Sequence, residues 1–127
     1  MRPDRGPSAV LSEAAPMLAY RATEALYAEQ PDLWRMGERG RARTLEDFGR
    51  HFEALTTLDT GLFREYVTYC MGLFSSHGFP QAWLVDAWRI MGTTIERELP
   101  ATVSTPALGV LRAGSDVAAK DPRRDGA

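Results

Sequence analysis

The chain has 127 residues, a length typical of one domain with a single hydrophobic core. Hydrophobic residues make up 44% of it and charged residues 25%, as in ordinary folded proteins, and no apolar run approaches the roughly 20 residues of a membrane-spanning helix. The net charge of −2 gives no general attraction to nucleic acid or to anionic lipid, so neither a nucleic acid nor a membrane is expected as a partner.

The two ends of the chain contain few large apolar residues. Residues 1–7 are expected to form a mobile leader and residues 114–127 a mobile tail, on either side of one helical domain over residues 8–113. No apolar signal-peptide core follows the leader, which predicts a cytoplasmic location.

The first helix is predicted to start at about Ser8 or Ser12 and to run to Glu29, and apolar residues recur in it at spacings of three and four. Pro16 interrupts this pattern, so the helix either kinks at Pro16 or begins there. Pro31 ends the helix, and Asp32 is a suitable cap for a short turn that carries Trp34.

The next helix is predicted to start between Gly40 and Thr44, and its apolar stripe ends at Leu55. A break follows at residues 58–61. Thr60 is a suitable N-cap for a further helix with a broad, strongly apolar face, which we expect to lie in the core.

The connection after this helix has the clearest local signal in the sequence. Gly78 suits the left-handed position past a helix end, Phe79 can pack back on Phe74, and Pro80 can open the next helix. So short a link predicts an antiparallel helical hairpin.

The helix expected over residues 80–99 has a core stripe and, beside it, a second apolar strip. This strip predicts either a homodimer interface or coverage by the first and last helices of the same chain. The predicted interface residues are Trp83, Ala87, Ile90 and Thr94.

A last short helix is expected after Pro106. Five to six helices without an alternating strand pattern predict an all-α protein, either globin-like or an irregular helical bundle.

Few residues of this chain are suited to chemistry. Cys70 is the single cysteine, which excludes an intramolecular disulfide, and it lies about 10 Å along one helix from His77, too far to share a metal ion. Burial against aromatic side chains is the commoner role for both histidines, His51 and His77. The site hypothesis is an interhelical ligand pocket lined by Phe48, His51, Phe52, Tyr66, Cys70 and His77.

No cofactor or metal is expected in the leading interpretation of this pocket. The alternative is a small-molecule site for haem or another tetrapyrrole, with His51 or His77 as the axial ligand. No paired carboxylates, nucleophile elbow or phosphate-binding loop is present in the sequence, so an enzymatic activity is not expected.

Arginines are densest between Arg35 and Arg50 and could bind a phosphate or an RNA backbone. Acidic residues interleave with them, and Arg43 with Asp47 and Glu46 with Arg50 have the spacing of helix-surface ion pairs. We therefore expect a solvated face whose charges neutralise one another.

A set of loosely spaced residues resembles a known helical module. The set is Gly37-x-Arg39-Gly40-Arg41-x-Arg43, Glu46-Asp47, His51, Leu55, Phe63-x-x-Tyr66-Val67 and Gly78-x-Pro80. It is similar to the module that precedes cobalamin-binding domains in some bacterial sensor proteins, and to the N-terminal non-haem globin-like domains of stressosome co-antagonist proteins. The resemblance covers residues 22–100.

In those families the module is a dimerising sensory or signal-relay domain fused to an output or ligand-binding domain. This chain lacks the Asp-x-His-x-x-Gly string through which many cobalamin domains place a histidine on the metal, and only a tail is expected after Leu111. The resemblance therefore implies a stand-alone relay or partner-binding module. The leading hypothesis is a non-enzymatic, cytoplasmic sensory or regulatory module that forms a homodimer, or binds a partner protein, and relays a signal through helix contacts.

Overall fold

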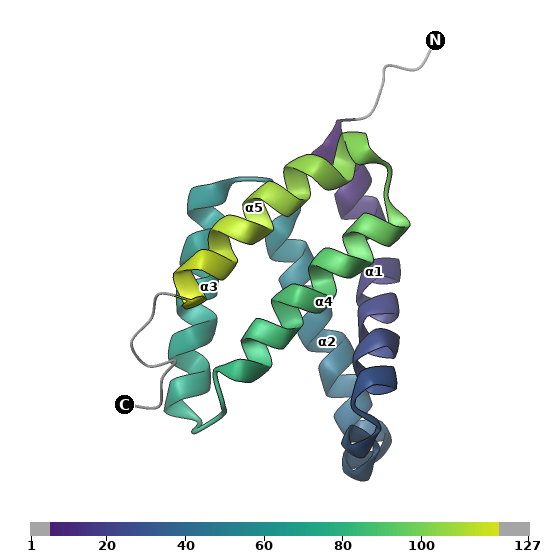
Figure 1. The fold of residues 1–127 in the computed structure, drawn as a ribbon, viewed down its shortest axis with the longest axis vertical. Coiled ribbons are helices and arrows are strands. Elements are labelled where there is room, and N and C mark those ends of the chain that lie inside the picture. The colour runs from purple at the N-terminus through teal and green to yellow at the C-terminus, as the bar shows by residue number, and fades with distance from the viewer. Residues whose placement is uncertain (1–5, 120–127) are drawn as a thin grey trace.

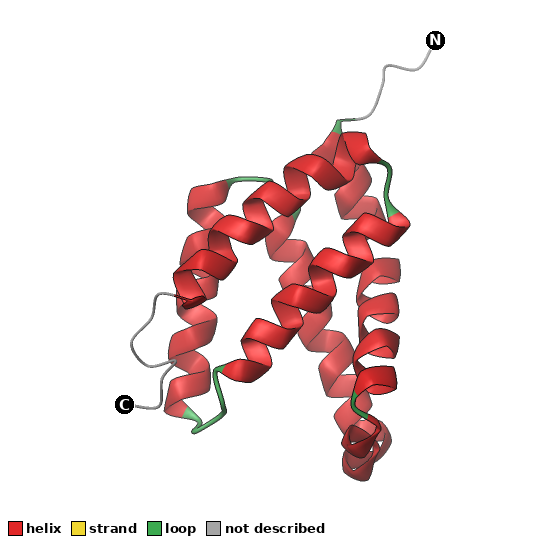
Figure 2. Ribbon diagram, viewed as in Figure 1, coloured by secondary structure: helices red, strands yellow, loops and turns green. Residues whose placement is uncertain are grey.

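The computed structural model describes residues 6–119, and all regular structure in that range is helical (Figures 1 and 2). The elements are α1 (Pro7–Glu29), the 3-10 helix η1 (Pro31–Met36), α2 (Gly37–Leu55), α3 (Thr60–Ser76), α4 (Ala82–Glu98) and α5 (Ala101–Ala119). The predicted all-α class is confirmed as a helical bundle. Among these residues no helix is long and apolar enough to cross a membrane.

Helix α1 is central to the packing of the bundle. It packs along α2, its neighbour in sequence, and also along α4, while α5 crosses both α4 and α3 (Figure 1). One core therefore includes side chains from all five helices, among them Leu18, Phe52, Phe63, Met91 and Ala107. Burying each large apolar side chain contributes about 1.5–3 kcal/mol to the free energy of unfolding.

The prediction of an antiparallel hairpin is wrong in one respect, because α3 and α4 do not pack along each other. The two helices separate from the turn that joins them, and α5 lies against each of them (Figure 1). Gly114 of α5 shows why α5 replaces α4 as the partner of α3, because a Cβ at this position would lie only 2.5 Å from the Phe63 ring and 2.9 Å from Val67. The missing side chain lets the α5 backbone approach α3 closely.

The last helix is much longer than predicted. It begins directly after Pro100 and continues through Pro106 to Ala119, so the prediction of a short helix after Pro106 is wrong. Its buried positions include Ala107, Gly114 and Ala118, small residues that give a weak apolar signal in the sequence. The predicted tail is consequently helical over residues 114–119, whereas residues 120–127 and 1–5 lie outside the described residues.

The helix ends differ in detail from the prediction. Helix α1 begins at Pro7 and runs through Pro16, so a start at Pro16 is wrong. The N-cap of α3 is Asp59, whose carboxylate accepts a hydrogen bond from the Leu62 amide at 2.9 Å, and not Thr60. A carboxylate at this position satisfies an otherwise unpaired amide of the first turn.

The turn between α3 and α4 forms as predicted in its first half. Gly78 has a φ of 72°, the Phe79 amide donates to the Phe74 carbonyl at 2.9 Å, and the two phenyl rings meet edge to face with centroids 5.5 Å apart. Helix α4 starts at Ala82, two residues after the predicted Pro80.

Candidate functional site

A buried polar cluster joins three helices at the centre of the bundle. The Nδ1 atom of His51 on α2 lies 2.7 Å from the hydroxyl of Tyr66 on α3. The His51 ring meets the indole of Trp88 on α4 edge to face, with centroids 4.8 Å apart, and Trp88 in turn contacts Phe63. His51 and Trp88 are both buried, so the cluster has little access to solvent.

Burial keeps the titratable groups of this cluster neutral. Desolvation lowers the pKa of His51 to about 4, against a smaller opposing effect of the Asp47 carboxylate. Desolvation also raises the pKa of the Tyr66 hydroxyl and that of the Cys70 thiol above their usual values. At neutral pH, therefore, neither an imidazolium, a phenolate nor a thiolate forms there, and the thiol is not a nucleophile.

Trp88 has a second notable property. Its Nε1 atom is buried and has no hydrogen-bond partner within residues 6–119. An unpaired buried donor costs about 1–3 kcal/mol. The contacts of the indole with the rings of His51 and Phe63 offset this cost by burying the apolar body of the side chain.

The structure brings together five of the six predicted pocket residues. Phe48, His51, Phe52 and Cys70 are buried and Tyr66 is half-buried, all in the same core. The sixth, His77, lies exposed at the end of α3 with its ring nitrogen 2.9 Å from the Leu73 carbonyl, so its placement in the pocket is wrong. Helix α3 ends there, and its last turn extends beyond the core.

The buried members pack on one another rather than around a hollow. The ring of Phe48 contacts those of His51 and Phe52 at centroid distances of 6.1 and 6.4 Å. Two surface grooves lie away from these residues, one between α1 and α2 beside Pro16 and Gly49, and one between α1 and α4 beside Ala25 and Thr93.

The predicted interface on α4 is only partly accessible. Ile90 is 1% exposed and Thr94 6% exposed, whereas Trp83 is 54% exposed and Ala87 is half-buried. The prediction is therefore wrong for Ile90 and Thr94. For these two residues the alternative prediction, coverage by a helix of the same chain, is the one that holds, because helix α1 covers that part of α4.

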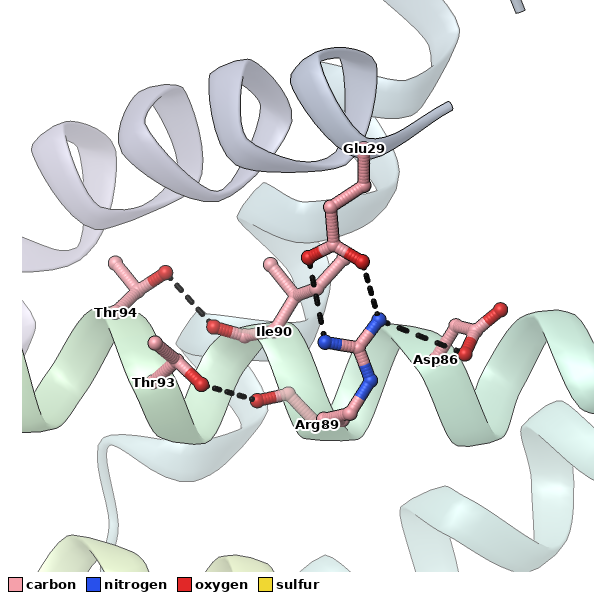
Figure 3. A network of polar contacts seen from close by, with 6 residues as sticks. All are labelled: Glu29, Asp86, Arg89, Ile90, Thr93 and Thr94. Carbon is pink, nitrogen blue, oxygen red and sulfur yellow. Dashed lines mark hydrogen bonds and ion pairs between the residues drawn. The ribbon is translucent and has the colours of Figure 1, made fainter. Parts of the chain in front are cut away.

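A solvent-exposed ion pair joins α1 and α4 beside this contact (Figure 3). The Arg89 guanidinium donates two hydrogen bonds to the Glu29 carboxylate, at 2.8 and 3.3 Å, and also lies 3.6 Å from Asp86. This pairing lowers the pKa of Glu29 and raises that of Arg89. On the same helix Thr94 donates to the Ile90 carbonyl at 2.8 Å, so its hydroxyl is satisfied within α4.

The arginine-rich segment is partly self-paired, as expected. Arg43 and Asp47 form the predicted pair, with 3.6 Å between guanidinium and carboxylate. Arg50 binds the same Asp47 at 2.5 Å, one residue away from the predicted partner Glu46. The guanidinium of Arg41 lies over the ring of Tyr20 on α1, 5.5 Å from its centroid. Two arginines thus share one carboxylate on the outer face of α2.

The sequence patterns did not predict an exposed apolar surface at the junction of α3 and α4, which we call the α3–α4 surface. It consists of Tyr69, Leu73, His77, Phe79 and Trp83, all of them exposed. Leu73 belongs to the broad apolar face of its helix, which was expected to lie in the core, but α5 covers only the neighbouring part of that face. The sequence contains a signal for this surface, because residues 66–85 include no Asp, Glu, Lys or Arg in a chain that is 25% charged.

The α3–α4 surface is continuous. Tyr69, Leu73 and His77 follow at four-residue intervals, so they lie along one side of α3. The ring of His77 stacks on that of Phe79 with centroids 5.5 Å apart, and Phe79 contacts Trp83 at 5.6 Å. The rings therefore link the end of α3 to the start of α4.

No group of three His, Cys, Asp or Glu side chains in the described range is arranged to hold a metal ion. Comparisons with protein-family models, with curated proteins and with solved structures found no significant match to the chain. The fold defines the chain as an all-α helical bundle, and its function has to be derived from its own residues.

Proposed function

We propose that this protein is a non-enzymatic, cytoplasmic regulatory module that works through contacts between protein chains, either as a homodimer or with a partner protein. The observation that supports this proposal most directly is the α3–α4 surface. Exposed Trp and Tyr side chains together with an absence of charge are typical of the centre of a protein–protein interface. Tyr69 and Trp83 are 64% and 54% exposed, and both lie in the uncharged segment.

The buried cluster supports the non-enzymatic part of the proposal. A general acid or base works best with a pKa near the operating pH and needs contact with substrate. His51, with its pKa lowered to about 4, is buried among aromatic rings, and the pKa of the Cys70 thiol is raised. The groups best suited to catalysis by residue type are thus held in unreactive forms.

The position of Tyr66 suggests how such a module could relay a signal. Tyr66 lies on α3 three residues before Tyr69, and its hydroxyl bonds to His51 inside the core. A contact that shifts α3 from outside would therefore act directly on the hydrogen bond between α3 and α2.

The packing weighs against a tetrapyrrole on His51. The indole of Trp88 lies 4.8 Å from the His51 ring and the Tyr66 hydroxyl lies 2.7 Å from its Nδ1 atom. An axial haem ligand needs one ring nitrogen free and an open face for the macrocycle. Both aromatic neighbours would have to move to provide that space.

Native mass spectrometry of the isolated protein tests the proposal. We expect only masses that correspond to whole numbers of this chain, or to the chain with another protein. A small molecule retained in stoichiometric amount would contradict the proposal, as would a Soret band after haem addition. So would a substrate turnover that is abolished by His51→Ala.

A further inference from the structure

We propose that the α3–α4 surface is the contact between two copies of this chain, related by a two-fold axis that passes near Leu73. This inference rests on the proposed function and names the partner and the surface. The surface comprises Tyr69, Leu73 and His77 on α3 together with Phe79 and Trp83.

Charge favours a second copy over an acidic or a basic partner. In a two-fold interface each surface meets itself, so any net charge on it faces a like charge. Residues 66–85 contain no Asp, Glu, Lys or Arg, and the polar side chains of the surface are those of Tyr69 and His77. Such a surface is complementary to itself, whereas it provides no group that would select an acidic or a basic partner.

The faces of the bundle that carry ion pairs are less suited to this contact. The outer face of α2 has the Arg43, Asp47 and Arg50 ion pairs, and the outer part of α4 next to α1 has the pair of Arg89 with Glu29. Burying such groups in an interface requires desolvating charges that water already stabilises. The α3–α4 surface can be buried without that cost.

The area of the surface predicts a reversible dimer. An aromatic side chain can bury about 150–250 Å². Three aromatics that are each near half exposed therefore provide roughly 300 Å² on each copy, and Leu73 and His77 extend this area. A standard stable interface buries about 800 Å² on each partner. The contact is smaller than that, so we expect dissociation on dilution through the micromolar range.

Leu73 lies between Tyr69 and His77 on α3, beside the proposed axis, so a charge placed at Leu73 meets the same charge on the second copy. We expect the native chain to sediment at twice the 14.1 kDa chain mass at high micromolar concentration. Leu73→Glu and Leu73→Arg should each sediment as monomers, because like charges repel across the axis. An equimolar mixture of the two variants should again form dimers, since opposite charges then face each other.

Met36→Glu and Met36→Arg are matched controls, because Met36 is exposed on η1, outside the proposed contact. They should leave the dimer intact, and far-UV circular dichroism should show native helicity in all four variants. A native chain that is monomeric throughout the range overturns the inference. So does a dimer that Leu73→Glu leaves intact, a mixture that stays monomeric, or an assembly that grows beyond two copies.

Failure of this inference can be distinguished from failure of the proposed function. A monomeric native chain that carries another protein in stoichiometric amount in native mass spectrometry would overturn the two-fold contact and leave the proposed function standing. A retained small molecule would overturn the proposed function, whatever the sedimentation profile.

Discussion

The Nδ1 atom of His51 and the hydroxyl of Tyr66 lie 2.7 Å apart and connect α2 to α3 inside the core. These helices otherwise approach each other at few points, since α2 packs mainly on α1, and α3 mainly on α5. A single hydrogen bond is thus a substantial part of the polar connection between them. Its strength depends on the protonation of His51.

Acid should destabilise the protein through His51. The pKa of His51 is about 4 in the folded chain, below the ordinary value of 6.5 that it regains on unfolding. The unfolded state then binds more protons between these two values, so the free energy of unfolding falls as the pH drops from 6.5 to 4. We expect His51 to contribute about 3 kcal/mol to this loss. Urea unfolding at a series of pH values measures it.

His51→Gln is the control for the acid prediction. Because Gln does not titrate, the variant should lose most of the pH dependence between 4 and 6.5, although its stability at pH 7 will be lower. An equally steep pH dependence in His51→Gln would show that carboxylates, and not His51, cause the loss of stability in acid.

Removing the Tyr66 hydroxyl should destabilise the fold without removing its helices. Tyr66→Phe leaves the buried Nδ1 atom of His51 without its partner, which costs about 1–3 kcal/mol in the free energy of unfolding. Tyr69→Phe is the matched control, because Tyr69 is exposed and should change stability by less than about 0.5 kcal/mol. Equal effects of the two substitutions would show that the buried bond contributes no stability.

Gly114→Ala should destabilise the contact of α5 with α3. The added Cβ would lie 2.5 Å from the Phe63 ring, and overpacking of this kind costs about 1–3 kcal/mol. Gly109→Ala lies in the same helix and meets open space, so it should stabilise the protein by about 0.5–1 kcal/mol through helix propensity. Urea denaturation measures the free energy of unfolding of both variants, which should change in opposite directions. Changes in the same direction would contradict the close approach of α5 to α3.

Asp59→Ala should weaken the start of α3. The Asp59 carboxylate accepts the Leu62 amide at 2.9 Å, and loss of such a cap costs about 0.5–2 kcal/mol. Thr60→Ala, at the first residue of the helix, is the comparison and should have the smaller effect. Thermal unfolding of both variants shows which residue caps the helix. A larger loss of stability for Thr60→Ala would identify Thr60 as the N-cap, as predicted from the sequence.

Local signals predicted the helical elements well where the residues are large or conformationally special. The turn at Gly78 is the clearest example, because a left-handed glycine followed by Phe79 is specified within a few residues. Helix α5 is the opposite case. Beside Val110 and Leu111, its buried face uses Ala107, Gly114 and Ala118. These small side chains weaken the periodic apolar signal, although they permit the closest packing.

The candidate site shows the same division. Five of the six proposed pocket residues do meet in the core, because each lies on the apolar face of its helix. His77 lies outside the core at the end of α3. Its position depends on where α3 ends relative to α5, which is a matter of tertiary structure. The sequence showed the apolar strip on α4 but allowed either a second chain or helices of the same chain to cover it. Only the position of α1 shows that Ile90 and Thr94 are covered within the chain.

The sequence by itself determined the helical class, most helix positions, the uncharged segment over residues 66–85 and the ion pair of Arg43 with Asp47, because these depend on neighbours a few residues apart. Only the tertiary structure decided which apolar faces are covered. The separation of α3 from α4, the crossing of α5 and the pairing of Glu29 with Arg89 are contacts between distant segments. They bury His51 and leave the α3–α4 surface exposed, since local spacing states which side of a helix is apolar but not what lies against it.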